Sequence, residues 1–151
     1  MNRQKQPKTK LSQWHALLLE SLRLHGWSTE ETLRRIGESD LPKDESAFGF
    51  DYAPLKELLA EEPETLERAI REGYQIKYNT IRGIKIWIAV AFGKEAGLEL
   101  EEGREAVVAE LDRAQREHLE SVLSYGWNLR CENGSPEGEH ALACRIEPQR
   151  G

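Results

Sequence analysis

The residues best suited to chemistry lie together in one segment, residues 74–92, and the chemistry they suit is anion binding. The segment combines basic and aromatic side chains, namely Tyr74, Lys77, Tyr78, Arg82 and Lys85. Lysine and arginine contact phosphates, and tyrosine rings stack on nucleobases. Residues 73–94 hold four bases and no acid, although the chain as a whole has a net charge of −6. These five residues are therefore the candidate site for a nucleic acid or another anion.

A second candidate surface is aromatic and suits a protein partner. Three of the four tryptophans form this candidate surface: Trp14 lies on one face of the expected helix 11–25, and Trp27 and Trp127 directly follow expected helix ends. Tryptophan is enriched at protein interfaces because one large ring buries much apolar area. The chain's net acidity favours this surface over the basic one, since an acidic protein repels nucleic acid at long range.

No pattern in the sequence predicts catalysis, a metal or a cofactor. The phosphate-binding loops, the zinc-protease helix and the nucleophile elbow are all missing. Cys131, His140 and Cys144 lack the C-x2-C spacing of zinc sites, and no fourth ligand is evident. We therefore expect no enzyme, no metal and no cofactor. Both cysteines are expected to be free thiols in a reducing cytoplasm, because no export signal precedes them.

Hydrophobic periodicity predicts a mainly α fold, a compact bundle of about five to six helices with disordered termini. Singly placed glycines and helix-capping residues set the predicted helix ends. The expected helices cover 11–25, 28–37, 51–61, 63–72, 80–92 and 99–125. The expected organisation is a disordered basic arm (1–10), one helical domain (11–128) and a flexible polar tail (129–151).

The segment 74–92 itself has two possible structures. As a helix it begins after Thr80 and ends at Gly93, with a short extended piece before it at 74–78. As a hairpin, two runs of alternating apolar residues flank a turn around Thr80. In the hairpin, Gly73-Tyr-x-Ile and Gly83-Ile-x-Ile resemble the wing of winged-helix DNA-binding domains. We favour the helix and do not assign the chain to that family.

Two functions follow from these observations. The first is a small non-enzymatic regulatory protein of the cytoplasm that acts as a protein-interaction adaptor. The alternative is a transcriptional regulator that binds nucleic acid through 74–92, in a helix-turn-helix-like or winged form. No membrane association is expected, and the predicted helix 99–125 offers a face for homo-oligomers. The exposure of Lys77, Arg82 and Lys85 separates the two functions. Cations that point into solvent favour nucleic acid, and cations paired with acids favour the adaptor.

Overall fold

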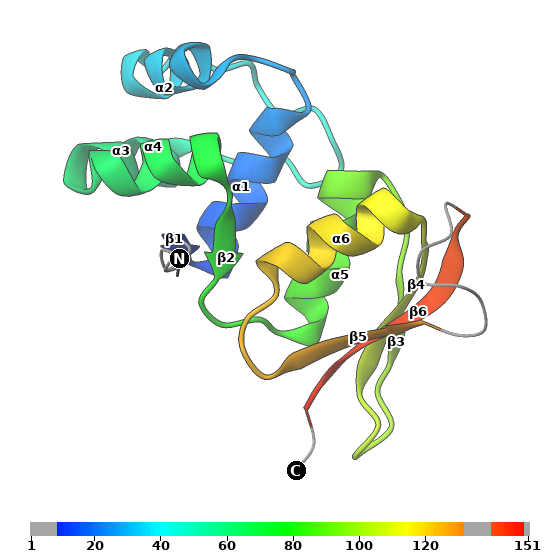
Figure 1. Ribbon diagram of the computed structural model, residues 1–151. Coiled ribbons are helices and arrows are strands. Elements are labelled where there is room, and N and C mark those ends of the chain that lie inside the picture. Colours follow the sequence, from blue (N-terminus) through cyan, green and yellow to red (C-terminus); the bar gives the residue numbers. More distant parts are fainter. Residues whose placement is uncertain (1–8, 132–139, 150–151) are drawn as a thin grey trace. The chain divides into compact units, whose positions relative to one another are not determined.

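The computed structural model describes residues 9–131 and 140–149, and the chain divides into two compact units, Met1–Gln75 and Ile76–Gly151 (Figure 1). Each unit is described by itself. The single helical domain predicted over 11–128 therefore corresponds to parts of two units. The predicted basic arm falls mostly on residues 1–8, outside the described residues, while residues 9 and 10 belong to a strand.

The first unit is helical. Its elements are β1 (Thr9–Leu11), α1 (Gln13–Arg23), α2 (Thr29–Glu38), α3 (Ala53–Glu61) and α4 (Pro63–Glu72), and β2 (Tyr74–Ile76) begins at its end. Side-chain oxygens of Ser12 and Ser28 accept the backbone N–H of His15 and Glu31, which caps α1 and α2. The core consists of fully buried aliphatic side chains, among them Leu18, Leu19, Leu22, Ile36, Leu55 and Leu66.

The second unit is a four-stranded antiparallel sheet with two helices. Its elements are α5 (Ile81–Phe92), β3 (Gly97–Glu99), β4 (Ala106–Leu111), α6 (Arg113–Val122), β5 (Trp127–Cys131) and β6 (Leu142–Pro148). The strand order is β3-β4-β6-β5, so β6 lies between β4 and β5. Figure 1 shows α5 and α6 on the same face of this sheet.

The covered face of the sheet is apolar because alternate residues of its strands point toward the helices. Val107 pairs with Ile146, and both are fully buried. Trp87 of α5 is 1% exposed, and its ring meets the rings of Phe92 and His118 edge to face at 5.2 and 5.1 Å. The aromatic contact with His118 joins α5 to α6 above the sheet.

The prediction of a mainly α fold is wrong, because the described residues are 47% helix and 20% strand and form two sheets. Besides the four-stranded sheet, β1 and β2 form a two-stranded parallel one. The predicted helix 99–125 is replaced by β3, β4 and α6. Asp112 starts α6 through a reciprocal capping box with Gln115, and this N-terminal signal lies in the middle of the predicted helix. The oligomer face predicted on that helix therefore does not exist as one surface.

The prediction of a flexible tail over 129–151 is wrong for residues 129–131, which belong to β5, and for residues 142–148, which form β6 between β4 and β5. The prediction of free thiols is also wrong. Cys131 and Cys144 face each other across β5 and β6 and form a disulfide. The alternation of apolar and polar residues in β6 is short and follows a Gly- and Glu-rich stretch, so its own sequence resembles a polar tail. Its pairing with β4, a distant strand, makes it part of the sheet.

The helical interpretation of 80–92 is confirmed. Thr80 caps α5 by accepting the N–H of Gly83, and Gly93 ends the helix in the left-handed conformation. The preceding extended piece is β2. The hairpin alternative, and with it the winged-helix resemblance, is therefore wrong.

Candidate nucleic-acid interface

Four of the five predicted anion-binding residues lie in the second unit. Lys77 and Tyr78 belong to the loop between β2 and α5, and Arg82 and Lys85 belong to the first turns of α5. Lys77, Tyr78 and Arg82 are exposed and Lys85 is half-buried. None of the three cations forms an ion pair within residues 9–131 and 140–149. Lys77 and Arg82 therefore meet the exposure criterion that favours nucleic acid over internal pairing, whereas Lys85 meets it only in lacking an ion pair within the described residues.

Many other arginines in the described part of the chain are neutralised by nearby carboxylates. Arg34 contacts Glu31 at 2.9 Å, and Arg113 contacts Glu117 at 3.1 Å. Hydrogen bonds from the Arg34 guanidinium, followed by those from Arg35, lower the pKa of Glu31. The lack of such pairing at 77–85 sets this segment apart from the exposed helix α2.

The start of α5 adds to the positive potential of the segment. An α-helix carries a partial positive charge at its N-terminus, which acidic residues usually offset. The first turn of α5 contains no acid and carries Arg82 instead. The partial positive charge of the helix N-terminus and the charge of Arg82 therefore add to each other, and both would attract an external anion.

Tyr74, the fifth predicted residue, lies in the first unit and does not face solvent. Its side chain is 1% exposed, and its hydroxyl donates a 2.6 Å hydrogen bond to Glu20. Its ring therefore has no face available for a nucleobase, and we leave it out of the candidate interface.

The loop that carries Lys77 and Tyr78 is fixed to a second loop far along the chain. The side-chain oxygen of Asn79 accepts hydrogen bonds from the backbone N–H and the hydroxyl of Ser124, at 2.7 and 2.8 Å. The Ser124 hydroxyl also lies 2.8 Å from the carbonyl oxygen of Ile76. The next residue, Tyr125, is 87% exposed. We call these two loops, 77–80 and 123–126, the junction.

Sequence reasoning did not include Tyr125 in the site. The signal that could have found it is charge, because residues 121–131 form a second acid-free segment that contains one arginine. The loop that carries Tyr125 is joined to the loop that carries Tyr78 by the Asn79–Ser124 hydrogen bonds, whose partners are 45 positions apart in the chain. Local patterns in a sequence do not reveal such a contact.

The three predicted tryptophans do not form one surface within either unit. Trp14 and Trp27 belong to the first unit and Trp127 to the second. Trp27 stacks on His25 at 4.5 Å, and the Arg35 guanidinium lies 4.5 Å from its ring centre. Trp127 is half-buried at the start of β5.

Trp14 belongs instead to an exposed aromatic cluster. Its ring, 49% exposed, meets Phe50 edge to face at 5.8 Å, and Phe50 stacks on the exposed Phe48 at 5.3 Å. The carboxylate of Asp44 accepts the backbone N–H of Ser46 and Phe50, which holds this loop in place. We call Trp14, Phe48 and Phe50 the aromatic cluster.

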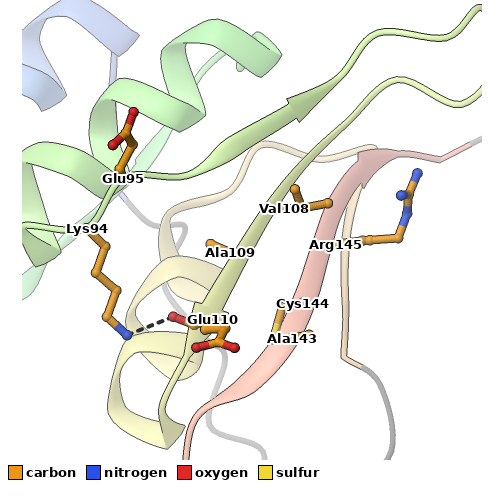
Figure 2. A pocket seen from close by; sticks show the side chains of 8 residues that line it. All are labelled: Lys94, Glu95, Val108, Ala109, Glu110, Ala143, Cys144 and Arg145. Carbon is orange, nitrogen blue, oxygen red and sulfur yellow. Dashed lines mark hydrogen bonds between the residues drawn. The ribbon is translucent and has the colours of Figure 1, made fainter.

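A cavity of about 650 Å³ opens beside β4 and β6 in the second unit (Figure 2). Its two cations already have partners. Lys94 donates to the carbonyl oxygen of Glu110 at 2.7 Å, and Arg145 pairs with Glu99 and Glu147. The hydrogen bond that the Arg145 guanidinium donates to the Glu99 carboxylate is the main reason why the pKa of Arg145 is raised. A ligand here would have to displace these contacts, so the cavity is the weaker candidate.

The described residues contain no cluster of three or more side chains suited to a metal ion. The disulfide also removes Cys131 and Cys144 from any zinc site. Among helices in residues 9–131 and 140–149, none has the length and hydropathy to cross a membrane. Comparison with family models, with curated proteins and with solved structures finds no match for this chain.

Proposed function

We propose that this chain is a non-enzymatic nucleic-acid-binding protein that contacts phosphates through Lys77, Arg82 and Lys85. The observation that carries the proposal is that these cations have no carboxylate partner in the described part of the chain. A nucleic acid supplies the missing anions, and release of its counterions provides the driving force.

The net charge of −6 does not oppose this function at short range. Charges separated by more than about 8 Å are largely screened at physiological ionic strength. Several acids outside 73–94 are also engaged by arginines, as in the contacts of Glu30 with Arg71 and Glu117 with Arg113. The segment that carries the three cations, residues 73–94, contains no acid of its own.

The test is the salt dependence of binding to labelled single-stranded and duplex oligonucleotides, followed by fluorescence anisotropy. Changing Lys77, Arg82 and Lys85 to glutamine should flatten the slope of log K against log salt by about 2–3 units. The matched control changes Lys43, Lys56 and Arg68 to glutamine, three exposed cations of the first unit. This control loses the same charge and should keep the wild-type slope.

Two results would count against the proposal. A wild-type protein that binds neither oligonucleotide at low salt excludes it. Equal loss of slope in both triple variants would mean that net charge, and not the candidate interface, governs binding.

An adaptor for another protein is the second candidate function, and the aromatic cluster favours it. Trp14 and Phe48 expose 49% and 42% of their surface, and aromatic anchors of this kind dominate many protein interfaces. If the adaptor function holds, affinity capture should recover the same protein partner with and without nuclease. A Trp14→Ser variant should lose that partner, and a Trp27→Ser variant should keep it.

A cytoplasmic location, where nucleic acid is abundant, is part of this proposal, and the disulfide provides its test. Disulfides are rare in a reducing cytoplasm. Trapping free thiols with an alkylating agent at the moment of lysis would show the state of Cys131 and Cys144 in the cell. Complete oxidation would argue for an oxidising compartment instead.

A further inference from the structure

Two tyrosines stand out on the surface of the second unit. Among large hydrophobic side chains in the described part of the chain, Tyr78 and Tyr125 are the most exposed, at 83% and 87%. Each tyrosine comes two positions after a buried residue: Tyr78 follows Ile76, which is 2% exposed, and Tyr125 follows Leu123, which is 5% exposed. The backbone just before each tyrosine is thus anchored in the core, while the side chains of Tyr78 and Tyr125 are largely exposed to solvent.

The two rings belong to loops that are held together. Tyr78 precedes Asn79, Tyr125 follows Ser124, and the Asn79 oxygen accepts two hydrogen bonds from Ser124. The Ser124 hydroxyl oxygen also lies 2.8 Å from the carbonyl oxygen of Ile76, so its single proton is placed between two acceptors. A ligand therefore meets two aromatic side chains on a preformed support, and little order has to be gained on binding.

The surroundings of the two rings are cationic. The junction is built from two segments without an acid, 73–94 and 121–131. Lys77 directly precedes Tyr78 and Arg82 follows it by four positions; both cations are exposed and have no partner in the described residues. We infer that the junction binds single-stranded nucleic acid, with bases stacked on Tyr78 and Tyr125 and phosphates on Lys77 and Arg82.

The inference rests on the proposed function and specifies which nucleic acid is bound. In a duplex the base faces are already stacked on one another, so protruding tyrosines would find only backbone and groove edges. In a single strand every base offers a free face, and stacking on an aromatic side chain is largely independent of sequence. The exposed rings therefore favour a single strand of mixed sequence over a duplex.

The test compares a fluorescein-labelled deoxythymidine strand, the same strand with abasic sites, and a duplex of equal length, by anisotropy in one buffer. Tyr78→Leu and Tyr125→Leu should each weaken binding to the intact strand by roughly five- to hundredfold. Both should leave the salt slope and the duplex affinity at the wild-type values, since no charge is removed. Tyr78→Phe and Tyr125→Phe keep the ring and are the matched controls, with single-strand affinity close to that of wild type.

The abasic strand separates stacking from any other effect of the substitutions. Wild-type protein should lose affinity for it by about the same factor as the double Tyr78→Leu/Tyr125→Leu variant loses for the intact strand. The double leucine variant should bind intact and abasic strands equally, while each single variant should keep part of the difference. Unchanged single-strand affinity in the double leucine variant, or tighter wild-type binding to the duplex, would overturn the inference. The proposed function would still be tested separately, because the glutamine variants of Lys77, Arg82 and Lys85 report on phosphate contacts and not on stacking.

Discussion

Tyr74 and Glu20, 54 positions apart, meet in the core of the first unit through a 2.6 Å hydrogen bond from the phenol to the carboxylate. Their exposed fractions are 1% and 3%. Arg23 approaches the same carboxylate at 3.4 Å. The pair thus explains why a tyrosine next to the basic segment belongs to the core and not to the candidate interface.

Tyr74→Phe should lower the free energy of unfolding by about 1–3 kcal/mol, because a buried carboxylate loses a donor that water cannot replace. Urea denaturation monitored by circular dichroism measures this change. Tyr78→Phe is the control, since its hydroxyl belongs to a side chain that is 83% exposed, and it should stay within about 0.5 kcal/mol of wild type. Equal stability of the two variants would show that the buried hydrogen bond contributes nothing.

Gly126→Ala should destabilise the protein by about 1 kcal/mol, because Gly126 has a φ of +91°, which a side chain disfavours. Gly37 offers the matched control. It lies inside α2, and an added methyl there would meet only the Leu59 side chain at 3.5 Å, an ordinary contact. Gly37→Ala should therefore be neutral or raise stability by up to about 1 kcal/mol. If Gly126→Ala costs nothing, the backbone of the junction is not fixed as described.

Replacing both Cys131 and Cys144 by alanine should cost roughly 2–4 kcal/mol, since the disulfide closes a loop with a sequence separation of 13. Thermal unfolding with and without a thiol reductant measures the effect. Reductant should lower the Tm of the wild type toward that of the double variant and leave the variant unchanged. A wild-type Tm that is insensitive to complete reduction, verified by thiol alkylation, would contradict this expectation.

The loop of the aromatic cluster should lose its order in acid. Burial disfavours the charged form of Asp44, but hydrogen bonds from the backbone N–H groups of Phe50 and Ser46 outweigh burial and lower the pKa of this carboxyl from its ordinary value. A lowered pKa means that the stabilisation is present at neutral pH and is lost as the pH falls through the folded-state value. The amide resonances of Ser46 and Phe50 should therefore shift together in acid, with a midpoint below that of an aspartate in an unfolded peptide. In Asp44→Asn neither resonance should titrate, and a wild-type midpoint above the unfolded-peptide value would contradict the prediction.

The sequence predicted those parts of the fold that depend on local signals. Thr80 and Gly93 mark the ends of α5 correctly, because capping is determined within one turn of chain. The helical prediction fails at β4 (Ala106–Leu111) because Val108 and Leu111 continue the helical spacing of the residues after them, and this periodicity outweighed the strand preference of valine. Its strand character comes from pairing with β6, whose residues lie more than thirty positions later in the chain.

The candidate interface was predictable to the same extent. Lys77, Tyr78, Arg82 and Lys85 were found from composition, because an acid-free segment is visible in the sequence. The exclusion of Tyr74 and the addition of Tyr125 both depend on contacts between distant residues, with Glu20 in one case and through Ser124 in the other. Neither contact leaves a pattern in the neighbouring sequence.

During synthesis the two units reach completion at different times. All four helices of the first unit are present once Glu72 has been added. In the second unit, β4 and β5 lack the strand that lies between them until Leu142–Pro148 have followed. For that interval the apolar face and the inner edge of β4 have no partner, a state in which nascent chains aggregate or are held by chaperones. The second unit therefore depends on protection from aggregation until β6 has been added, whereas the helices α1 to α4 of the first unit are complete much earlier.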